Sequence, residues 1–167
     1  MRGGETFNRK VYIADSFRRS VRYSKSNFYA FSPSGFDFMR ANQHNTQTNY
    51  IKNYEFDYPQ TRSFFVVTCV SGHITSHDFY DTHRKWNSCE PFELFDAPVE
   101  VQIAPDKKPI EQNLMTQARR SDLLMIWTDC DREGEHIGME IVKVCRKAKP
   151  GIQVKRARFS AIIAQYV

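Results

Sequence analysis

The chain has 167 residues, a formal net charge of +5 at neutral pH and a pI of about 9.1. This length suits one domain with its own core, and 41% hydrophobic with 26% charged residues excludes a wholly disordered chain. No apolar stretch approaches the roughly 20 residues of a membrane helix, and the N-terminus carries no recognisable secretory signal. We therefore expect an intracellular protein, and the excess of positive charge favours a polyanionic partner such as nucleic acid.

The first 105 residues divide into a poorly patterned start, two strands and a loop region. Residues 1–45 show little periodicity apart from a short apolar run at residues 11–14. Residues 50–58 alternate large and polar side chains, and residues 64–70 form a β-branched and aromatic run, so both segments are predicted strands. Residues 71–105 contain several prolines and predict ordered loop with short irregular structure.

The rest of the chain alternates helices and strands. An apolar stripe of Ile110, Leu114 and Ala118 predicts a helix that begins at Pro109 and ends near residue 119. The apolar run 123–127 predicts a central strand, residues 134–148 a second helix, and residues 154–159 another strand. This order predicts an α/β domain with a mainly parallel sheet flanked by helices, in which ligands bind at the carboxyl ends of the strands.

Four carboxylates crowd the loop after the predicted central strand. Residues 128–135 read TDCDREGE, with Asp129, Asp131, Glu133 and Glu135 within seven residues. Two carboxylates about 4 Å apart repel by roughly 4 kcal/mol at an effective dielectric constant of 20, so a cation is the natural partner. Oxygen ligands favour a hard ion, Mg²⁺ or Mn²⁺ or Ca²⁺, over zinc or copper.

The acidic loop has two alternative interpretations. Acidic side chains at a helix N-terminus can simply complement the helix dipole. The loop also matches the acidic positions, the glycine and the final glutamate of an EF-hand, with Glu140 in the last place. An EF-hand, however, needs an amphipathic helix before the loop, and the run 123–127 has no polar face.

The loop instead carries the D-x-D-x-E-G-E motif of the Toprim fold, a Rossmann-like α/β fold. Residues 126–138, IWTDCDREGEHIG, closely resemble the corresponding stretch of the eukaryotic topoisomerase III family, which are type IA DNA topoisomerases. Other resembling segments follow in the same order along the chain, including YIKNY at 50–54, TCVSGHI at 68–74, LFDAP at 94–98 and RARFS at 156–160. The resemblance covers residues 49–160.

The resemblance implies an enzyme that cleaves and reseals single-stranded DNA through a tyrosine nucleophile. It assigns Asp129, Asp131 and Glu133 to metal-assisted catalysis as ligands of Mg²⁺, or Mn²⁺, near the scissile phosphate. It puts His73 and Arg156 near the phosphodiester as DNA-binding residues, although a histidine after a strand is often a structural hydrogen-bonding residue. It further implies a nuclear protein with a helicase as partner. Because no apolar stretch is long enough to span a bilayer, we expect no membrane association.

Two features of the family have no clear counterpart in the sequence. The family's first strand ends in a catalytic Glu-Lys pair, and the nearest analogue is the segment 11–16, with Asp15 in place of the glutamate. The family's tyrosine lies well beyond the metal-binding domain, and Tyr166 does not match its motif. We therefore expect residues 1–45 to be a divergent or misassigned N-terminal segment, and residues 46–167 to be a C-terminally truncated Toprim domain that is inactive alone.

Two alternative functions stay open at this point. A chain without the nucleophile could act as a non-catalytic module that binds nucleic acid and Mg²⁺. It could also be another Toprim enzyme, a primase or a nuclease, which would share the acidic motif but not the flanking segments.

Overall fold

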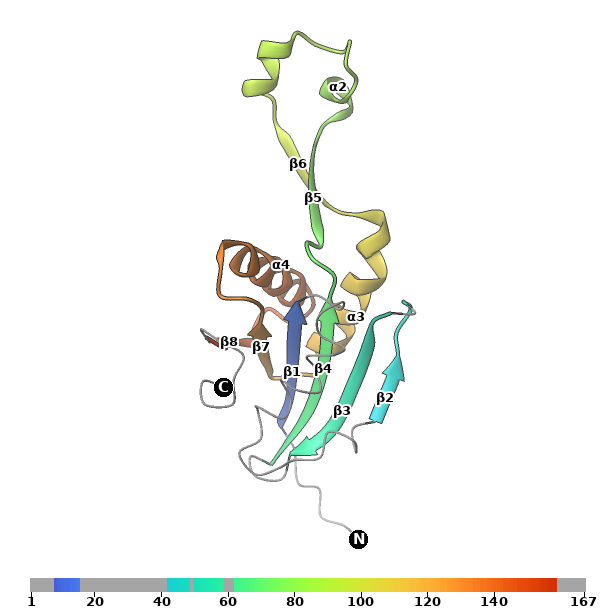
Figure 1. Cartoon of the computed structure of the whole chain (residues 1–167), viewed down its shortest axis with the longest axis vertical. Helices are drawn as coiled ribbons and strands as arrows, with labels where there is room; N and C mark the ends of the chain where they lie inside the picture. The colour runs from blue at the N-terminus through green and yellow to red at the C-terminus, as the bar shows by residue number, and fades with distance from the viewer. Residues whose placement is uncertain (1–7, 16–41, 49, 59–61, 159–167) are drawn as a thin grey trace.

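The structure is a computed structural model that describes residues 8–15, 42–48, 50–58 and 62–158. Its main feature is a six-stranded sheet (Figure 1). The strands lie side by side in the order β2 (Asn42–Asn45), β3 (Lys52–Tyr58), β4 (Ser63–Val70), β1 (Asn8–Asp15), β7 (Leu123–Trp127) and β8 (Gln153–Arg156). The predicted strand at 123–127 is therefore an internal strand, paired on one side with β1 and on the other with β8.

The sheet is mixed. β4, β1, β7 and β8 run parallel to one another, whereas β2, β3 and β4 are antiparallel neighbours, because short connections join them. A separate two-stranded ribbon of β5 (Thr75–Phe79) and β6 (Val99–Ile103) is also antiparallel. The predicted α/β class is confirmed, but the mainly parallel sheet is not, since half of the pairings among the described strands are antiparallel.

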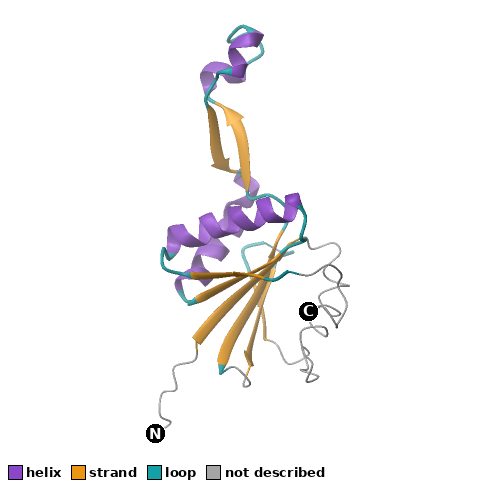
Figure 2. Cartoon of the chain, turned by 90° about the vertical axis from the view of Figure 1, so that its left-hand side faces the viewer, coloured by secondary structure: helices purple, strands orange, loops and turns teal. Residues whose placement is uncertain are grey.

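Two long helices cover one face of the sheet (Figure 2). They are α3 (Lys108–Arg119) and α4 (Arg132–Ala148), close to the predicted bounds, and they pack against each other. The prediction of helices flanking the sheet holds for this face; the described residues include no helix on the other face.

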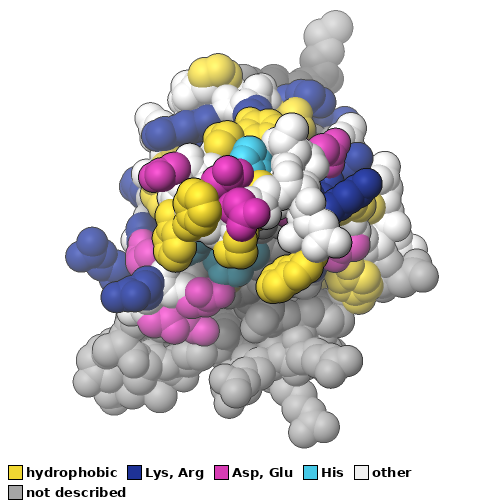
Figure 3. Space-filling model, turned by 90° about the horizontal axis from the view of Figure 1, so that it is seen from above, with side chains coloured by type: hydrophobic (Ala, Val, Ile, Leu, Met, Phe, Trp, Pro, Cys, Tyr) yellow, Lys and Arg dark blue, Asp and Glu magenta, His cyan; other side chains and the backbone are white. Residues whose placement is uncertain are grey.

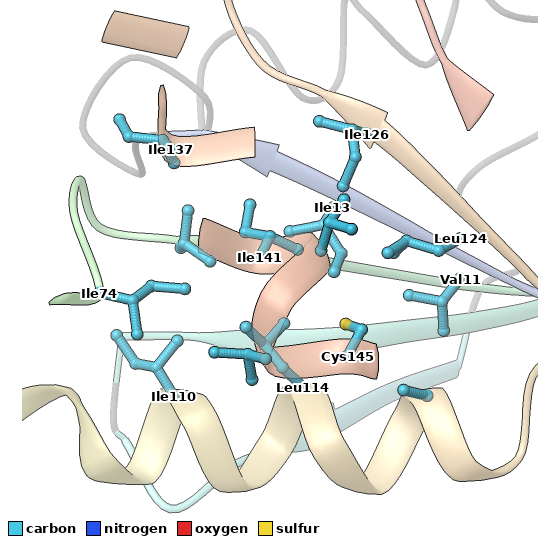
Figure 4. Packing of buried hydrophobic residues seen from close by; sticks show 14 of the residues in the cluster. Val11, Ile13, Ile74, Ile110, Leu114, Leu124, Ile126, Ile137, Ile141 and Cys145 are labelled. Carbon is cyan, nitrogen blue, oxygen red and sulfur yellow. The ribbon is translucent and has the colours of Figure 1, made fainter. Parts of the chain in front are cut away.

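The core lies between these helices and the sheet (Figure 4). Alternate residues of β1 and β7 point into it, and α3 and α4 contribute residues about one helical turn apart. The buried side chains labelled there are Val11, Ile13, Ile74, Ile110, Leu114, Leu124, Ile126, Ile137, Ile141 and Cys145. This packing fixes the position of α4 relative to β1 and β7.

Residues 75–103 form an arm that projects from the domain (Figure 1). β5 and β6 make its stem, with Thr75 opposite Ile103 and Phe79 opposite Val99. Beyond them the chain forms α2 (Asp81–Arg84) and a short 3-10 helix, Pro91–Phe95. The prediction of irregular loop for residues 71–105 was wrong for the stem, because β5 (TSHDF) shows no apolar alternation and β6 (VEVQI) alternates over only five residues between prolines.

The predicted domain division at residue 45 stays a prediction. β1 and β2, which precede that boundary, are both strands of the main sheet, and Tyr166 lies outside the described residues. In the described part of the chain, no helix has the length and apolar character that crossing a membrane requires.

Candidate metal and DNA site

The site residues predicted from the sequence gather at one edge of the sheet. Because β4, β1, β7 and β8 are parallel, their carboxyl ends lie at the same edge. Asp15 is the last residue of β1 and pairs in register with Val70, the last residue of β4. His73 follows β4, Asp129 follows β7, and Arg156 ends β8. This is the edge at which parallel α/β sheets bind their ligands.

The acidic loop turns directly into α4. Asp131 is the N-cap of this helix, and its Oδ1 accepts a hydrogen bond from the Gly134 amide at 2.7 Å. Thr128, which is buried, donates from Oγ1 to the Gly134 carbonyl at 2.8 Å. A Cβ at Gly134 would lie 2.0 Å from the Asp129 carbonyl oxygen. Only glycine therefore allows the helix to start this close to the end of β7.

Arg156 holds the same loop from the neighbouring strand. Its Nη2 donates to the Asp129 carbonyl at 2.8 Å, and its Nε donates to Glu135 Oε1 at 2.9 Å. Its Nη1 donates to the Ala157 carbonyl at 2.7 Å. The guanidinium is thus bound by protein groups of the loop, and its predicted role in DNA binding stays a prediction.

His73 bridges two glutamates of α4. Its Nε2 lies 2.6 Å from Glu133 Oε1, and its Nδ1 lies 3.0 Å from Glu140 Oε1. Because ionised carboxylates only accept hydrogen bonds, both ring nitrogens act as donors, as in protonated imidazolium. Partial burial lowers the pKa of His73, but the hydrogen bonds to Glu140 and Glu133 outweigh it and raise that pKa above its usual value. His73 therefore fixes the direction of the Glu133 carboxylate.

Glu140 is the buried anchor of this arrangement, with a side chain only 3% exposed. Its carboxylate accepts hydrogen bonds from the Ile74 amide at 2.8 Å, the Thr75 hydroxyl and His73. Burial raises the pKa of Glu140, but these hydrogen bonds lower it below its ordinary value overall. The carboxylate is thus ionised and ties α4 to the base of the arm.

The side chains that converge most closely are not the three predicted metal ligands. Among the described residues, one group of three has all its ligand atoms within 4.8 Å of one another, and it comprises His73, His136 and Glu140. The carboxylates of Asp129, Asp131 and Glu133 are exposed, and Glu133 touches this group only through His73. Since Glu140 and His73 already satisfy each other and their neighbours, we interpret this group as a hydrogen-bonded cluster.

Glu140 and His136 were missed as site residues by the sequence analysis. In the sequence, Glu140 stands out only as the last position of an EF-hand loop. A signal was available: Glu140 lies on the face of α4 that carries Ile137, Ile141 and Val144, all of them buried. A glutamate on an apolar helix face needs hydrogen-bond partners in the interior.

Comparison with known proteins agrees with this geometry. Residues 18–162 match the family model described as the Toprim domain. The chain is 44% identical over 119 residues to DNA topoisomerase 3-alpha of Arabidopsis thaliana and 49% identical over 113 residues to DNA topoisomerase 3-alpha of Homo sapiens. It is 51% identical over 96 residues to DNA topoisomerase 3 of Caenorhabditis elegans.

These matches cover 70%, 66% and 58% of this chain, respectively, but only 13%, 11% and 13% of the relatives. The chain thus spans little more than a tenth of the length of those relatives.

Proposed function

This chain belongs to the Toprim domain family, and from that premise we propose that it is the metal-binding domain of a topoisomerase III-like type IA DNA topoisomerase. The observation that carries the proposal is the common edge at which β1, β4, β7 and β8 end, with the D-x-D-x-E loop directly after β7. The names of the relatives support the choice of a topoisomerase over a primase or a nuclease.

Asp129, Asp131 and Glu133 are the residues that would hold Mg²⁺ or Mn²⁺. All three offer oxygen atoms, the ligands that such hard ions prefer, and all three are exposed at the end of the sheet. Mg²⁺ is usually held by one or two carboxylates and keeps several waters, so the three carboxylates need not converge fully. When bound, the ion would offset negative charge at a phosphate.

The surrounding residues support this role by fixing the ligands. Asp131 is held by the Gly134 amide, and Glu133 is held by His73, which in turn rests on buried Glu140. Arg156 fixes the Asp129 backbone. Among the described residues the Asp129 carboxylate makes no hydrogen bond or ion pair, which leaves it free to bind a cation. Residues that orient metal ligands in this way raise the affinity of a site for its metal.

The remaining steps of the proposed reaction need a nucleophile and a proton donor. We propose that a tyrosine outside the chain attacks the phosphate of single-stranded DNA, which separates cleavage and resealing into two reversible steps. The greater length of the relatives supports a separate source for it. Asp15, the last residue of β1, is proposed to donate a proton to the leaving oxygen. A helicase partner and a nuclear location belong to the same proposal and rest on family resemblance alone.

A chimera tests this function. The 113-residue match in human DNA topoisomerase 3-alpha would be replaced by the corresponding stretch of this chain, and cleavage of a labelled single-stranded oligonucleotide would be measured. We expect Mg²⁺-dependent cleavage and resealing, lost in a chimera with Asp129→Asn and Asp131→Asn. A folded chimera that binds the oligonucleotide but never forms a covalent adduct would contradict the proposal.

A further inference from the structure

The arm formed by residues 75–103 has no core of its own. None of its 29 side chains is buried, although the arm contains many large apolar residues. At its end, Trp86 is 94% exposed, Phe95 90% and Phe92 69%. Isolated two-stranded ribbons are marginally stable in water, and exposed aromatic clusters mark interaction sites. The arm therefore carries an apolar surface suited to burial against another surface.

The segment 86–96, which we call the arm tip, carries the exposed side chains of Trp86, Phe92 and Phe95 and, close to them in the sequence, Glu90, Glu93 and Asp96. Seen from above, hydrophobic and acidic side chains lie next to one another at the projecting end of the molecule (Figure 3). In the part of the chain that the structure describes, none of the three carboxylates forms an ion pair. The Pro91–Phe95 turn holds the two phenylalanines three residues apart.

The charge of the arm is opposite to that of the whole chain. Residues 75–103 contain six acidic and two basic residues, while the chain carries a net charge of +5. Of the two basic residues, Arg84 is neutralised within the arm by Asp78 at 3.1 Å and Asp81 at 3.0 Å. Stacking of bases on aromatic rings normally accompanies a positively charged groove. The acidic border of the arm tip therefore disfavours nucleic acid and favours a basic protein surface.

We propose that the arm tip docks into an apolar pocket bordered by Lys and Arg on the part of a topoisomerase polypeptide that lies outside this chain. This inference rests on the proposed function. It is supported by the charge of the tip and by the length of the relatives, in which 87–89% of the polypeptide lies beyond the match. The arm leaves the sheet directly after His73, and Glu140 holds its base through Ile74 and Thr75. Docking of the tip thus positions the candidate site against the rest of the enzyme.

The proposal is tested by binding in trans. The full 167-residue chain would be titrated against Arabidopsis DNA topoisomerase 3-alpha lacking its 119 matched residues, and the dissociation constant measured. We expect Trp86→Ser with Phe95→Ser to weaken binding at least tenfold, and the matched control Met139→Ser, an exposed apolar residue on α4, to stay within twofold. Circular dichroism would verify that each variant and the deletion partner are folded, so that a lack of binding cannot be due to an unfolded protein.

A second pair of variants tests the charge. Glu93→Lys should weaken binding severalfold, with a shallower salt dependence, whereas Asp57→Lys on β3 should not. Equal binding of the partner protein by the wild type and by the Trp86→Ser/Phe95→Ser variant would overturn the proposal. A variant that loses binding to oligo(dT) but keeps binding to the partner protein would also overturn it. Failure of the wild type to bind would also overturn it. If the wild type does not bind, cleavage of DNA by the chimera would still establish the proposed function. Failure of the docking proposal and failure of the proposed function are therefore distinguishable.

Discussion

Glu140 on α4 and His73 after β4, 67 residues apart in the chain, meet at 3.0 Å between Oε1 and Nδ1. The same ring contacts Glu133 through its other nitrogen, so one buried carboxylate fixes both the base of the arm and a predicted metal ligand. A buried charge of this kind is retained because its hydrogen bonds and its ionic partner offset the cost of desolvation. The relationship therefore couples the core to the site.

The first prediction concerns Glu140 itself. Glu140→Gln keeps the shape but loses the ionised acceptor that faces His73, and we expect the free energy of unfolding to fall by about 1–3 kcal/mol. Glu140→Ala leaves the Ile74 amide and Thr75 hydroxyl without this acceptor, and should cost about 3–5 kcal/mol. Urea denaturation would measure both. Glu93→Gln on the exposed arm is the control, and its free energy of unfolding should change by less than about 0.5 kcal/mol. An equally small loss for Glu140→Gln would refute the anchoring role of Glu140.

The second prediction concerns the glycine at the start of α4. Alanine favours a helix over glycine by about 1 kcal/mol, yet Gly134→Ala should destabilise the protein by about 1–3 kcal/mol, because its Cβ would lie 2.0 Å from the Asp129 carbonyl oxygen. Gly151→Ala, whose Cβ would have nothing within 4 Å, should change stability by less than about 0.5 kcal/mol. Thermal unfolding of the two variants would check this; a Gly134→Ala protein more stable than the wild type would rule out the close approach.

The third prediction concerns alkaline pH. Burial raises the pKa of the Cys145 thiol from an ordinary value of 9.0 to about 12. Between pH 9 and pH 12 the thiol is deprotonated in the unfolded chain but protonated in the folded protein. The contribution of this thiol to stability is therefore present below pH 9 and is lost as pH rises toward 12. Cys145→Ala should therefore lose stability less steeply above pH 9, by up to about 1.4 kcal/mol per pH unit. Urea denaturation from pH 8 to 10.5 would measure the slopes, and identical slopes would exclude a buried thiol with a raised pKa.

Much of the fold was predictable because periodicity survives in the strongly buried elements. The stripe Ile110, Leu114 and Ala118 predicted α3, and the apolar run at 123–127 predicted β7, since both are buried by the same core. The position of the acidic loop could also be predicted from the sequence. The loop follows a predicted parallel strand, and the carboxyl ends of parallel strands meet at one edge of the sheet. Its metal and catalytic assignments stay predictions.

What the sequence did not reveal depends on long-range contacts. β1 looked like a short apolar run in an unpatterned segment, yet it pairs with β4 and β7 in the middle of the sheet. The stem of the arm was missed because its two strands are only five residues long and β5, unlike β6, shows no alternation of apolar and polar residues. Glu140 was undervalued because its partners, His73 and Ile74, lie more than 60 residues away and come together only through the packing of α4 on the sheet.

The central claim is that the loop after β7 binds a divalent metal. The most direct measurement is isothermal titration of the full chain with Mg²⁺, repeated on the Asp129→Asn/Asp131→Asn double variant and on a matched control, Asp57→Asn/Asp96→Asn, with two exposed carboxylates elsewhere. We predict weak Mg²⁺ binding that is retained by the control and abolished in the Asp129/Asp131 variant. An unchanged titration in that variant would contradict the metal site.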